Sequence, residues 1–451
     1  MPKNAYVTPT IERKVAGVPT KPAIQGLISY QDNINGVPIR KLIEKFGSPL
    51  FVLSEKSIRR KYKSAYRAFS LQYPKVKFAW SYKTNYLNAI CAIFHQEGAW
   101  AEVVSGMEYY KARLLGIPGK KIIFNGPAKT ENDLIRATKE SAIINIDYRD
   151  ELFLLEKIAE KLGKSPRVGI RINMDTGIYP QWTRFGFNYE NMEAYRAVQR
   201  LQSGNKLRLI GLHTHIGTFI LEPNAYYIAA AKLLKLALTI EEDFGIPVEF
   251  IDLGGGFASS NTLHQQYLPG EYSSPSLDQY ADAIGKAFNE SPFCRKRQPT
   301  LFLETGRALI DEAGFLISSV VGRKTLPDGR RALIIDAGVN MLYTSNWYKH
   351  KIVPAQPITG TLEETVIYGP LCMNIDVIRY GIRLPDLRVG DKVIIKSVGA
   401  YNLTQWMQFI SCRPNVVLIA ENGDVDLIRE AENLNDIVSR EKLPERLRLK
   451  K

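Results

Sequence analysis

The segments VKFAWSYK (76–83), EFIDLGGG (249–256) and TLFLETG (300–306) decide the fold of this chain. Each is a short run rich in apolar and aromatic residues that ends in glycines or a polar side chain. Helical patterns such as RDELFLLEKIAEKLG (149–163) alternate with these runs between residues 76 and 306. Further strand candidates lie at 100–105, 121–126, 142–147, 167–173 and 207–217. Eight strands alternating with helices predict a parallel (β/α)8 barrel.

After about residue 311 the alternation of strand and helix patterns stops. Runs such as FLISSVVGRK (315–324) and KVIIKSVGAY (392–401) alternate with turn residues and predict an antiparallel β-domain. We therefore expect a barrel over residues 46–310 and a C-terminal β-domain over 311–451. Residues 1–45 are expected to form an arm that adds a strand to the β-domain, and FGSPLFVLS (46–54) could add one too.

Composition excludes several function classes. The formal charge is +14, but the basic residues are spread along the chain and no nucleic-acid-binding motif accompanies them. No apolar run approaches the roughly 18 residues of a membrane span, and the N-terminus lacks an apolar signal core. The four cysteines are scattered without metal-ligand spacing, so we expect neither a zinc site nor a disulfide framework. A cytoplasmic enzyme without bound metal is the expectation.

Lys83 is the first candidate for chemistry. Active sites of such barrels lie at the carboxyl ends of the strands, and Lys83 closes an apolar strand there. Burying an ammonium is costly and lowers its pKa, which would make this amine a nucleophile for covalent bonding to a carbonyl. A solvent-exposed lysine at a strand end is the simpler alternative.

Three further strand ends carry suggestive residues. The glycines at 254–256 could cradle a phosphate, although GGG also suits an ordinary loop. His215 could lie flat against a cofactor ring, and its spacing from His213 leaves a metal pair conceivable. Glu304 could pair with a cationic ring nitrogen while Arg307 meets an anion; a structural Glu–Arg pair is the alternative.

Cys372 is the remaining candidate. It follows a Gly-Pro turn in the predicted β-domain, within GPLCMNID (369–376), where a loop thiol could donate a proton.

These motifs together resemble one family. The order and spacing of SYKTN (81–85), GLHTHIG (211–217), DLGGGF (252–257), ETGR (304–307), GPLC (369–372) and GAYN (399–402) are similar to those of the pyridoxal-phosphate (PLP) decarboxylases of the alanine-racemase fold, the group of diaminopimelate and ornithine decarboxylase. The resemblance spans about residues 30–430. It implies a PLP-dependent decarboxylase.

The resemblance also implies residue roles. Lys83 would bind PLP covalently, His215 would stack on its ring, and Glu304 would keep its pyridine nitrogen protonated. The phosphate would be held by Gly255, Gly256, Arg307 and Tyr401, with Thr218 nearby. Cys372 would enter the partner subunit's site and protonate the product, so the chain would form an obligate homodimer whose active sites the β-domain completes.

The chain departs from the family pattern at the substrate end. An acidic residue normally follows the cysteine, but Met373 stands here, and Thr344 and Tyr348 take the positions of an arginine and an aspartate. Lys349, His350 and Lys351 follow. With Arg307, Met373 and Tyr348 would contact the substrate. We expect an amino acid with a neutral or anionic distal group, such as a citryl-linked siderophore intermediate.

Three other functions stay open. Diaminopimelate decarboxylation to L-lysine would require that residues 349–351 face solvent and that other contacts bind the substrate. A racemase of the same fold would need a second base on the opposite face of the cofactor–substrate adduct, and the GPLC loop favours decarboxylation over it. A non-catalytic binding paralogue would typically have lost Lys83 or Cys372, and both are present.

Overall fold

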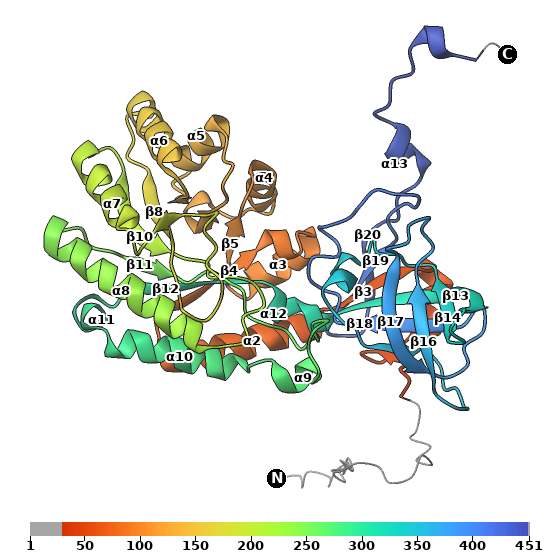
Figure 1. Cartoon of the computed structure of the whole chain (residues 1–451). Coiled ribbons are helices and arrows are strands. Elements are labelled where there is room, and N and C mark those ends of the chain that lie inside the picture. Colours follow the sequence, from red (N-terminus) through yellow and green to blue (C-terminus); the bar gives the residue numbers. More distant parts are fainter. Residues whose placement is uncertain (1–28, 450–451) are drawn as a thin grey trace, which may run out of the picture.

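The barrel is the larger of two parts of the chain. A computed structural model describes residues 29–449, and within them eight parallel strands form a closed ring in which β12 pairs with β4 and β8 with β10 (Figure 1). The predicted barrel is therefore confirmed. Its strands are β4 (Val76–Ser81), β5 (Trp100–Val103), β6 (Ile122–Phe124), β7 (Ile143–Ile146), β8 (Arg167–Asn173), β10 (Arg208–His213), β11 (Phe250–Asp252) and β12 (Thr300–Thr305).

Helices cover the outside of this ring (Figure 1). Their ends follow the local sequence: Thr130 and Asp133 form a capping box at α5, and Gly245 ends α8 in the left-handed conformation. The main helices are α2 (Glu55–Gln72), α3 (Asn88–Gln96), α4 (Gly106–Leu114), α5 (Glu131–Lys139), α6 (Arg149–Leu162), α7 (Glu193–Gly204), α8 (Asn224–Phe244), α10 (Leu277–Glu290) and α11 (Pro292–Arg297).

The second part is a β-domain built mainly from the C-terminal segment. Most of its pairs are antiparallel, as predicted, but β14 pairs with β16 in parallel, and so does β3 with β19. Its strands are β3 (Leu50–Ser54), β13 (Gly314–Thr325), β14 (Arg331–Ile335), β15 (Ile352–Pro354), β16 (Glu363–Tyr368), β17 (Val377–Leu384), β18 (Lys392–Lys396), β19 (Val416–Ile419) and β20 (Val425–Arg429).

The N-terminal segment belongs with this β-domain as far as Ser54. Strand β3 lies between β13 and β19, and α1 (Ile39–Phe46) packs Ile39 and Leu42 into the same apolar cluster as Val52 and Ile317. The barrel begins with α2. Most of the arm expected over residues 1–45 lies outside the described residues, which there comprise only 29–45 with the short β1 (Asn33–Ile34) and β2 (Val37–Pro38).

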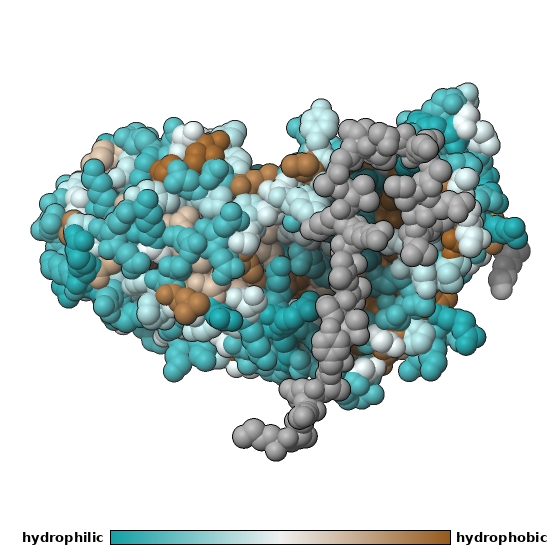
Figure 2. All heavy atoms as spheres, turned by 90° about the horizontal axis from the view of Figure 1, so that it is seen from below, coloured by the Kyte–Doolittle hydropathy of each residue, from teal (hydrophilic) through white to brown (hydrophobic). Residues whose placement is uncertain are grey.

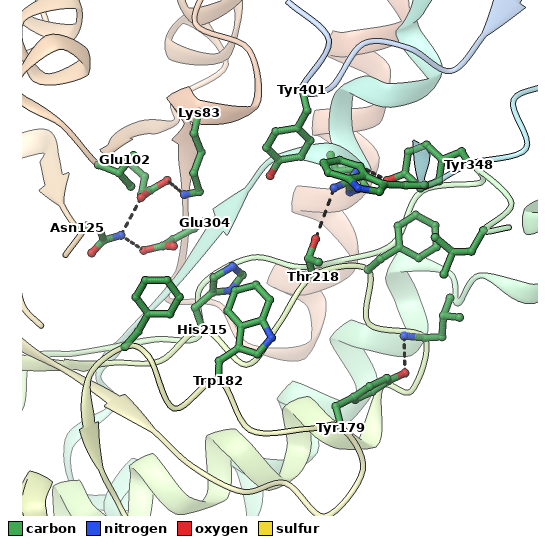
Figure 3. A pocket seen from close by; sticks show the side chains of 18 of the residues that line it. Lys83, Glu102, Asn125, Tyr179, Trp182, His215, Thr218, Glu304, Tyr348 and Tyr401 are labelled. Carbon is green, nitrogen blue, oxygen red and sulfur yellow. Dashed lines mark hydrogen bonds and ion pairs between the residues drawn. The ribbon is translucent and has the colours of Figure 1, made fainter. Parts of the chain in front are cut away.

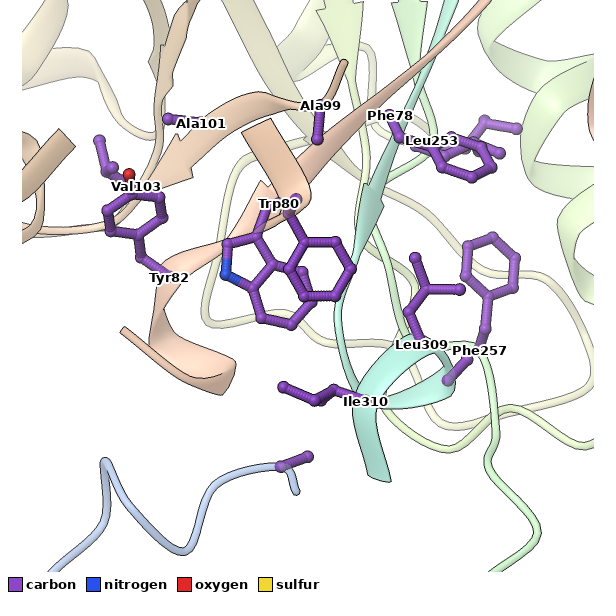
Figure 4. Packing of buried hydrophobic residues seen from close by; sticks show 14 of the residues in the cluster. Phe78, Trp80, Tyr82, Ala99, Ala101, Val103, Leu253, Phe257, Leu309 and Ile310 are labelled. Carbon is purple, nitrogen blue, oxygen red and sulfur yellow. The ribbon is translucent and has the colours of Figure 1, made fainter. Parts of the chain in front are cut away.

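One continuous apolar core joins the two parts. Trp80 stacks on Phe94 with ring centroids 3.6 Å apart, and Leu309 and Ile310 extend the packing toward the β-domain (Figure 4). The surface in Figure 2 is mostly hydrophilic, with small separate hydrophobic patches. Within residues 29–449, no helix is both long and apolar enough to cross a membrane.

Candidate active site

A cavity of about 950 Å³ lies at the carboxyl ends of the barrel strands. Strand-end residues line its inner part, while loops and the β-domain supply the outer wall (Figure 3). It brings together Lys83, His215, Thr218, Glu304, Arg307, Tyr348 and Tyr401, all of which the sequence had singled out. Gly255 and Gly256 line an adjoining hollow that shares Lys83, His215, Thr218, Glu304, Arg307 and Tyr401.

Lys83 is held by a buried carboxylate. Its position on η1 (Tyr82–Thr84), directly after β4, turns the side chain into the cavity, where Nζ donates a hydrogen bond to Glu102 Oε2 at 2.6 Å. Burial alone would lower the pKa of Lys83, but the carboxylates of Glu102 and Glu304 outweigh it and raise the pKa. The expectation of a lowered pKa for Lys83 was therefore wrong. Glu102 lies on β5 and Glu304 on β12, so the sequence around Lys83 does not show that two carboxylates are near its amine. In this state the amine is an ion-paired ammonium.

Glu304 lies beside the same network. Asn125 Nδ2 donates to Glu102 at 3.0 Å and also to Glu304, so one amide bridges the two carboxylates (Figure 3). Burial would raise the pKa of Glu304, but His213, at 3.2 Å, and Lys83 outweigh it and hold that pKa well below its usual range. Glu304 is therefore an ionised, almost fully buried acceptor, suited to a cationic ring nitrogen.

His215 presents an uncharged ring to the cavity. Burial lowers its pKa to about 3, so the imidazole is neutral. Trp182 meets it edge-on, with ring centroids 5.5 Å apart and planes at 75° (Figure 3). Among the described residues, none hydrogen-bonds His215 Nδ1. A flat, neutral ring with a free edge suits stacking against an aromatic cofactor.

The glycine turn that borders the second hollow can carry no side chain. Gly256 has φ +95°, and a Cβ there would come closer than 3.0 Å to the carbonyl oxygen of Gly217; at Gly255 it would overlap that of Glu304. The hollow beside this turn also contains Thr218 and Arg307. These features suit a phosphate, whose oxygens need close approach to the backbone.

Arg307 supplies the positive charge of this hollow. It donates to Tyr348 Oη and, at 3.5 Å, to Thr218 Oγ1, and its guanidinium lies 4.6 Å from the Tyr401 ring centroid. Within residues 29–449, no carboxylate forms an ion pair with it, although Arg307 is buried. A buried guanidinium without a direct ion-pair partner is suited to binding an anion.

Several residues named from the sequence lie elsewhere. Cys372 is exposed on its loop, and neither it nor Met373 lines the cavity of its own chain; Met373 packs partly buried against the core. Thr344 is buried and hydrogen-bonds Asn402 and His350, so it does not contact the cavity.

The basic stretch at 349–351 does not line the cavity either. His350 is fully buried, and burial lowers its pKa to about 3. Lys349 Nζ donates to the Gln266 carbonyl, and Lys351 pairs with Glu271 on the surface at 3.5 Å. The interpretation that this basic stretch helps select the distal group of the substrate therefore has no contact behind it in the cavity of this chain.

Sequence reasoning missed other parts of the site. Glu102 interrupts the apolar run WAEVV (100–104), and that interruption could have revealed it. Trp182 and Tyr179 come from the loop after β8, which has no periodicity to read. The amides Gln265 and Gln266 likewise come from an irregular loop, and Asn346 ends the short 3-10 helix Tyr343–Asn346.

Comparison with known proteins decides the family. Residues 55–311 match the family described as "Pyridoxal-dependent decarboxylase, pyridoxal binding domain". This chain belongs to the pyridoxal-dependent decarboxylases. Diaminopimelate decarboxylase of Aquifex aeolicus is 30% identical over 429 residues, covering 91% of this chain and 96% of the relative.

Two further relatives of this decarboxylase bear on the fold and the substrate. The crystal structure of diaminopimelate decarboxylase from Methanocaldococcus jannaschii has a TM-score of 0.85 and 30% identity, with 93% and 99% of the two chains covered. The L-glutamyl-[BtrI acyl-carrier protein] decarboxylase of Niallia circulans is 28% identical, with 90% and 96% covered. The fold, the PLP dependence and the carboxy-lyase activity predicted from the sequence are confirmed.

Proposed function

We propose that this decarboxylase binds PLP at the barrel mouth through Lys83 and removes the α-carboxyl group of an amino acid whose distal part carries no positive charge. The observation that carries the proposal is the cavity itself. A lysine, an ionised buried carboxylate, a neutral imidazole and a cationic glycine-lined hollow converge there.

The cofactor contacts follow from this arrangement. The phosphate would lie in the hollow formed by Gly255 and Gly256, with Arg307, Tyr401 and Thr218 around it. Backbone N–H groups and one guanidinium are the donors that a phosphate requires.

The ring contacts follow in the same way. Glu304 would accept the pyridine N–H, His215 would cover one ring face, and Lys83 would bond the cofactor's carbonyl carbon. When bound, PLP takes up the electron pair released from the substrate's α-carbon as CO₂ leaves.

The residues of this chain control charge and protons around that chemistry. The ionised Glu304 would hold the proton on the ring nitrogen by opposite charge in a poorly solvated site. Glu102 is placed to orient the Lys83 amine, which lies 2.6 Å from it. Trp182 packs edge-on against His215 and would shield that side of the cavity from water.

Cys372 would act from a second copy of the chain. It is exposed on the β-domain and lies outside its own cavity. We propose a homodimer in which this thiol enters the neighbouring site and protonates the product. Mixing the inactive variants Lys83→Ala and Cys372→Ala should then restore part of the activity, because hybrid dimers contain one intact site. Separate, self-sufficient sites would show no recovery.

The outer wall supports a substrate whose distal part carries no positive charge. Its lining is aromatic and amide-bearing: Tyr179, Trp182, Phe185, Trp347, Tyr348, Gln265, Gln266 and Asn346. Among the described residues of the lining, the carboxylates are Glu102 and Glu304, both next to Lys83. A distal ammonium would therefore meet no acidic partner from this chain.

Two substrate types fit such a wall. One is the amide-linked citryl derivative of a diamino acid, as in siderophore biosynthesis. Its carboxylates would need a cationic partner, and that partner would be Arg171, which lines the cavity with Asp147 at 3.3 Å from it. The other is an aminoacyl thioester on a carrier protein, the substrate type named for the Niallia circulans relative.

A CO₂-release assay distinguishes these substrates. Purified holoenzyme is supplied with diaminopimelate, a citryl-diamino acid or a glutamyl-carrier-protein thioester, with Lys83→Ala as the inactive control. Turnover of either extended substrate well above that of diaminopimelate supports the proposal. Brisk turnover of free diaminopimelate, or no CO₂ from either extended substrate, contradicts it.

A further inference from the structure

Two carboxylates and one imidazole lie close together near the carboxyl ends of three neighbouring barrel strands. They come from the neighbouring parallel strands β10, β11 and β12. His213 ends β10 and is paired in register with Asp252, which ends β11. Asp252 is in turn the register partner of Phe302 on β12, and Glu304 lies two residues after Phe302. All three are nearly inaccessible to solvent, with exposed fractions of 1%, 0% and 4%.

Their contacts are close but incompletely satisfied. His213 Nε2 lies 3.2 Å from Glu304 Oε1, and one polar atom from each of the three side chains lies within 4.8 Å of the others. Asp252 Oδ1 accepts the Gly254 N–H at 2.9 Å. Asp252 Oδ2 and both ring nitrogens of His213 have no hydrogen-bond partner among the described residues.

Two buried carboxylates this close cannot both be ionised, so one of them holds a proton. Glu304 accepts from Asn125 and faces Lys83 and His213, which favour its charged form. Burial, and then the charge of Glu304, raise the pKa of Asp252. The proton therefore resides on Asp252, whose free Oδ2 can donate it to Glu304.

We propose that Asp252 and His213 are positioning residues for Glu304. Asp252 donates its proton to the Glu304 carboxylate, and His213 supports the same carboxylate from the neighbouring strand. Together they keep Glu304 ionised and oriented toward the cofactor's ring nitrogen. This inference rests on the proposed pairing of Glu304 with that nitrogen.

Other charges face this cluster from the surrounding strands. Lys83 and Glu102 approach from the β4 and β5 side, and His215 and Arg171 from the β10 and β8 side. The same three ligand atoms could instead hold a divalent metal ion, which would turn Glu304 away from the cofactor. The experiment must therefore separate a proton from a metal.

The first arm measures PLP affinity of the apoenzyme by fluorescence titration. Asp252→Asn and His213→Gln keep an N–H donor toward Glu304, whereas Asp252→Ala and His213→Leu remove it. We expect the first pair to bind PLP as the natural protein does and the second pair to bind about tenfold more weakly, the loss of one hydrogen bond to a charged group. If Asp252→Ala binds PLP as tightly as Asp252→Asn, and His213→Leu as tightly as His213→Gln, the proposal is overturned.

The second arm measures thermal unfolding of the apoenzyme against pH. A raised pKa in the folded state stabilises the protein fully below the ordinary aspartate value of 3.8, and this contribution is lost as pH rises toward the folded-state pKa. Residue 252 cannot ionise in Asp252→Asn. The melting temperature of this variant minus that of the natural protein should therefore increase as pH rises. A constant difference overturns the proposal, even if the alanine variant fails to fold.

Metal analysis completes the test. One tightly held divalent ion per purified chain, lost in His213→Leu, would overturn the proton-sharing role in favour of a metal site. Failure of the proposed function is recognised separately: the natural protein would then bind no PLP at Lys83. Normal Lys83 labelling with unaltered Asp252→Asn profiles would refute only the positioning role.

Discussion

Replacing Gly256 by alanine tests the phosphate hollow most stringently. The residue has φ +95°, where a side chain costs roughly 1–3 kcal/mol in strain. Its new Cβ would also collide with the Gly217 carbonyl oxygen. That oxygen cannot move cheaply, because Ile220 N–H is hydrogen-bonded to Gly256 O at 2.9 Å and ties the two loops together. The segment carrying Thr218 must therefore shift away from the hollow.

We expect Gly256→Ala to weaken PLP binding roughly 10- to 100-fold, about 1.4–2.7 kcal/mol, and to lower the melting temperature of the apoenzyme. Gly163→Ala is the matched control: it has φ +59° at the end of α6, but no atom lies within 4 Å of its Cβ, so it should lose stability and keep its PLP affinity. A folded Gly256→Ala protein with unchanged PLP affinity would refute the placement of the phosphate.

Four further outcomes are expected. Lys83→Ala should lose the visible absorbance of the lysine-linked cofactor while remaining folded by circular dichroism. Asn125→Ala should weaken PLP binding about tenfold in the same titration, because Glu102 and Glu304 lose their shared donor. Trp182→Ala should raise KM several-fold and leave kcat nearly unchanged, since it removes outer wall rather than reacting groups. Burial raises the pKa of Glu108 from 4.5 to about 7. The stabilisation provided by the protonated Glu108 carboxyl is therefore lost as pH rises from 4.5 to about 7. Over this pH range the melting temperature of Glu108→Gln should increase relative to that of the natural protein.

The barrel could be predicted because its strands are buried on both faces. Each reads as a short apolar run, and the polar residue that ends it falls at the cavity. Lys83, His215 and Glu304 therefore emerged from strand ends alone, and the glycines beside them from the turn that follows β11.

What could not be predicted depends on contacts between distant segments. The pKa of Lys83 is raised mainly by Glu102 on the next strand. Strand β3 joins a sheet whose other strands lie more than 250 residues away in the sequence. The stretch 349–351 enters β15 from an irregular loop, where no periodicity indicates which side chains face the cavity. Sequence proximity to Tyr348, which does line it, was misleading.

Reductive trapping tests the central chemistry directly. Holoenzyme is treated with borohydride, digested and analysed by mass spectrometry, so that any lysine linked to the cofactor carries a stable phosphopyridoxyl group. The label should appear on Lys83 and on no other lysine. A label on a different lysine, or none on protein saturated with PLP, would contradict the assignment.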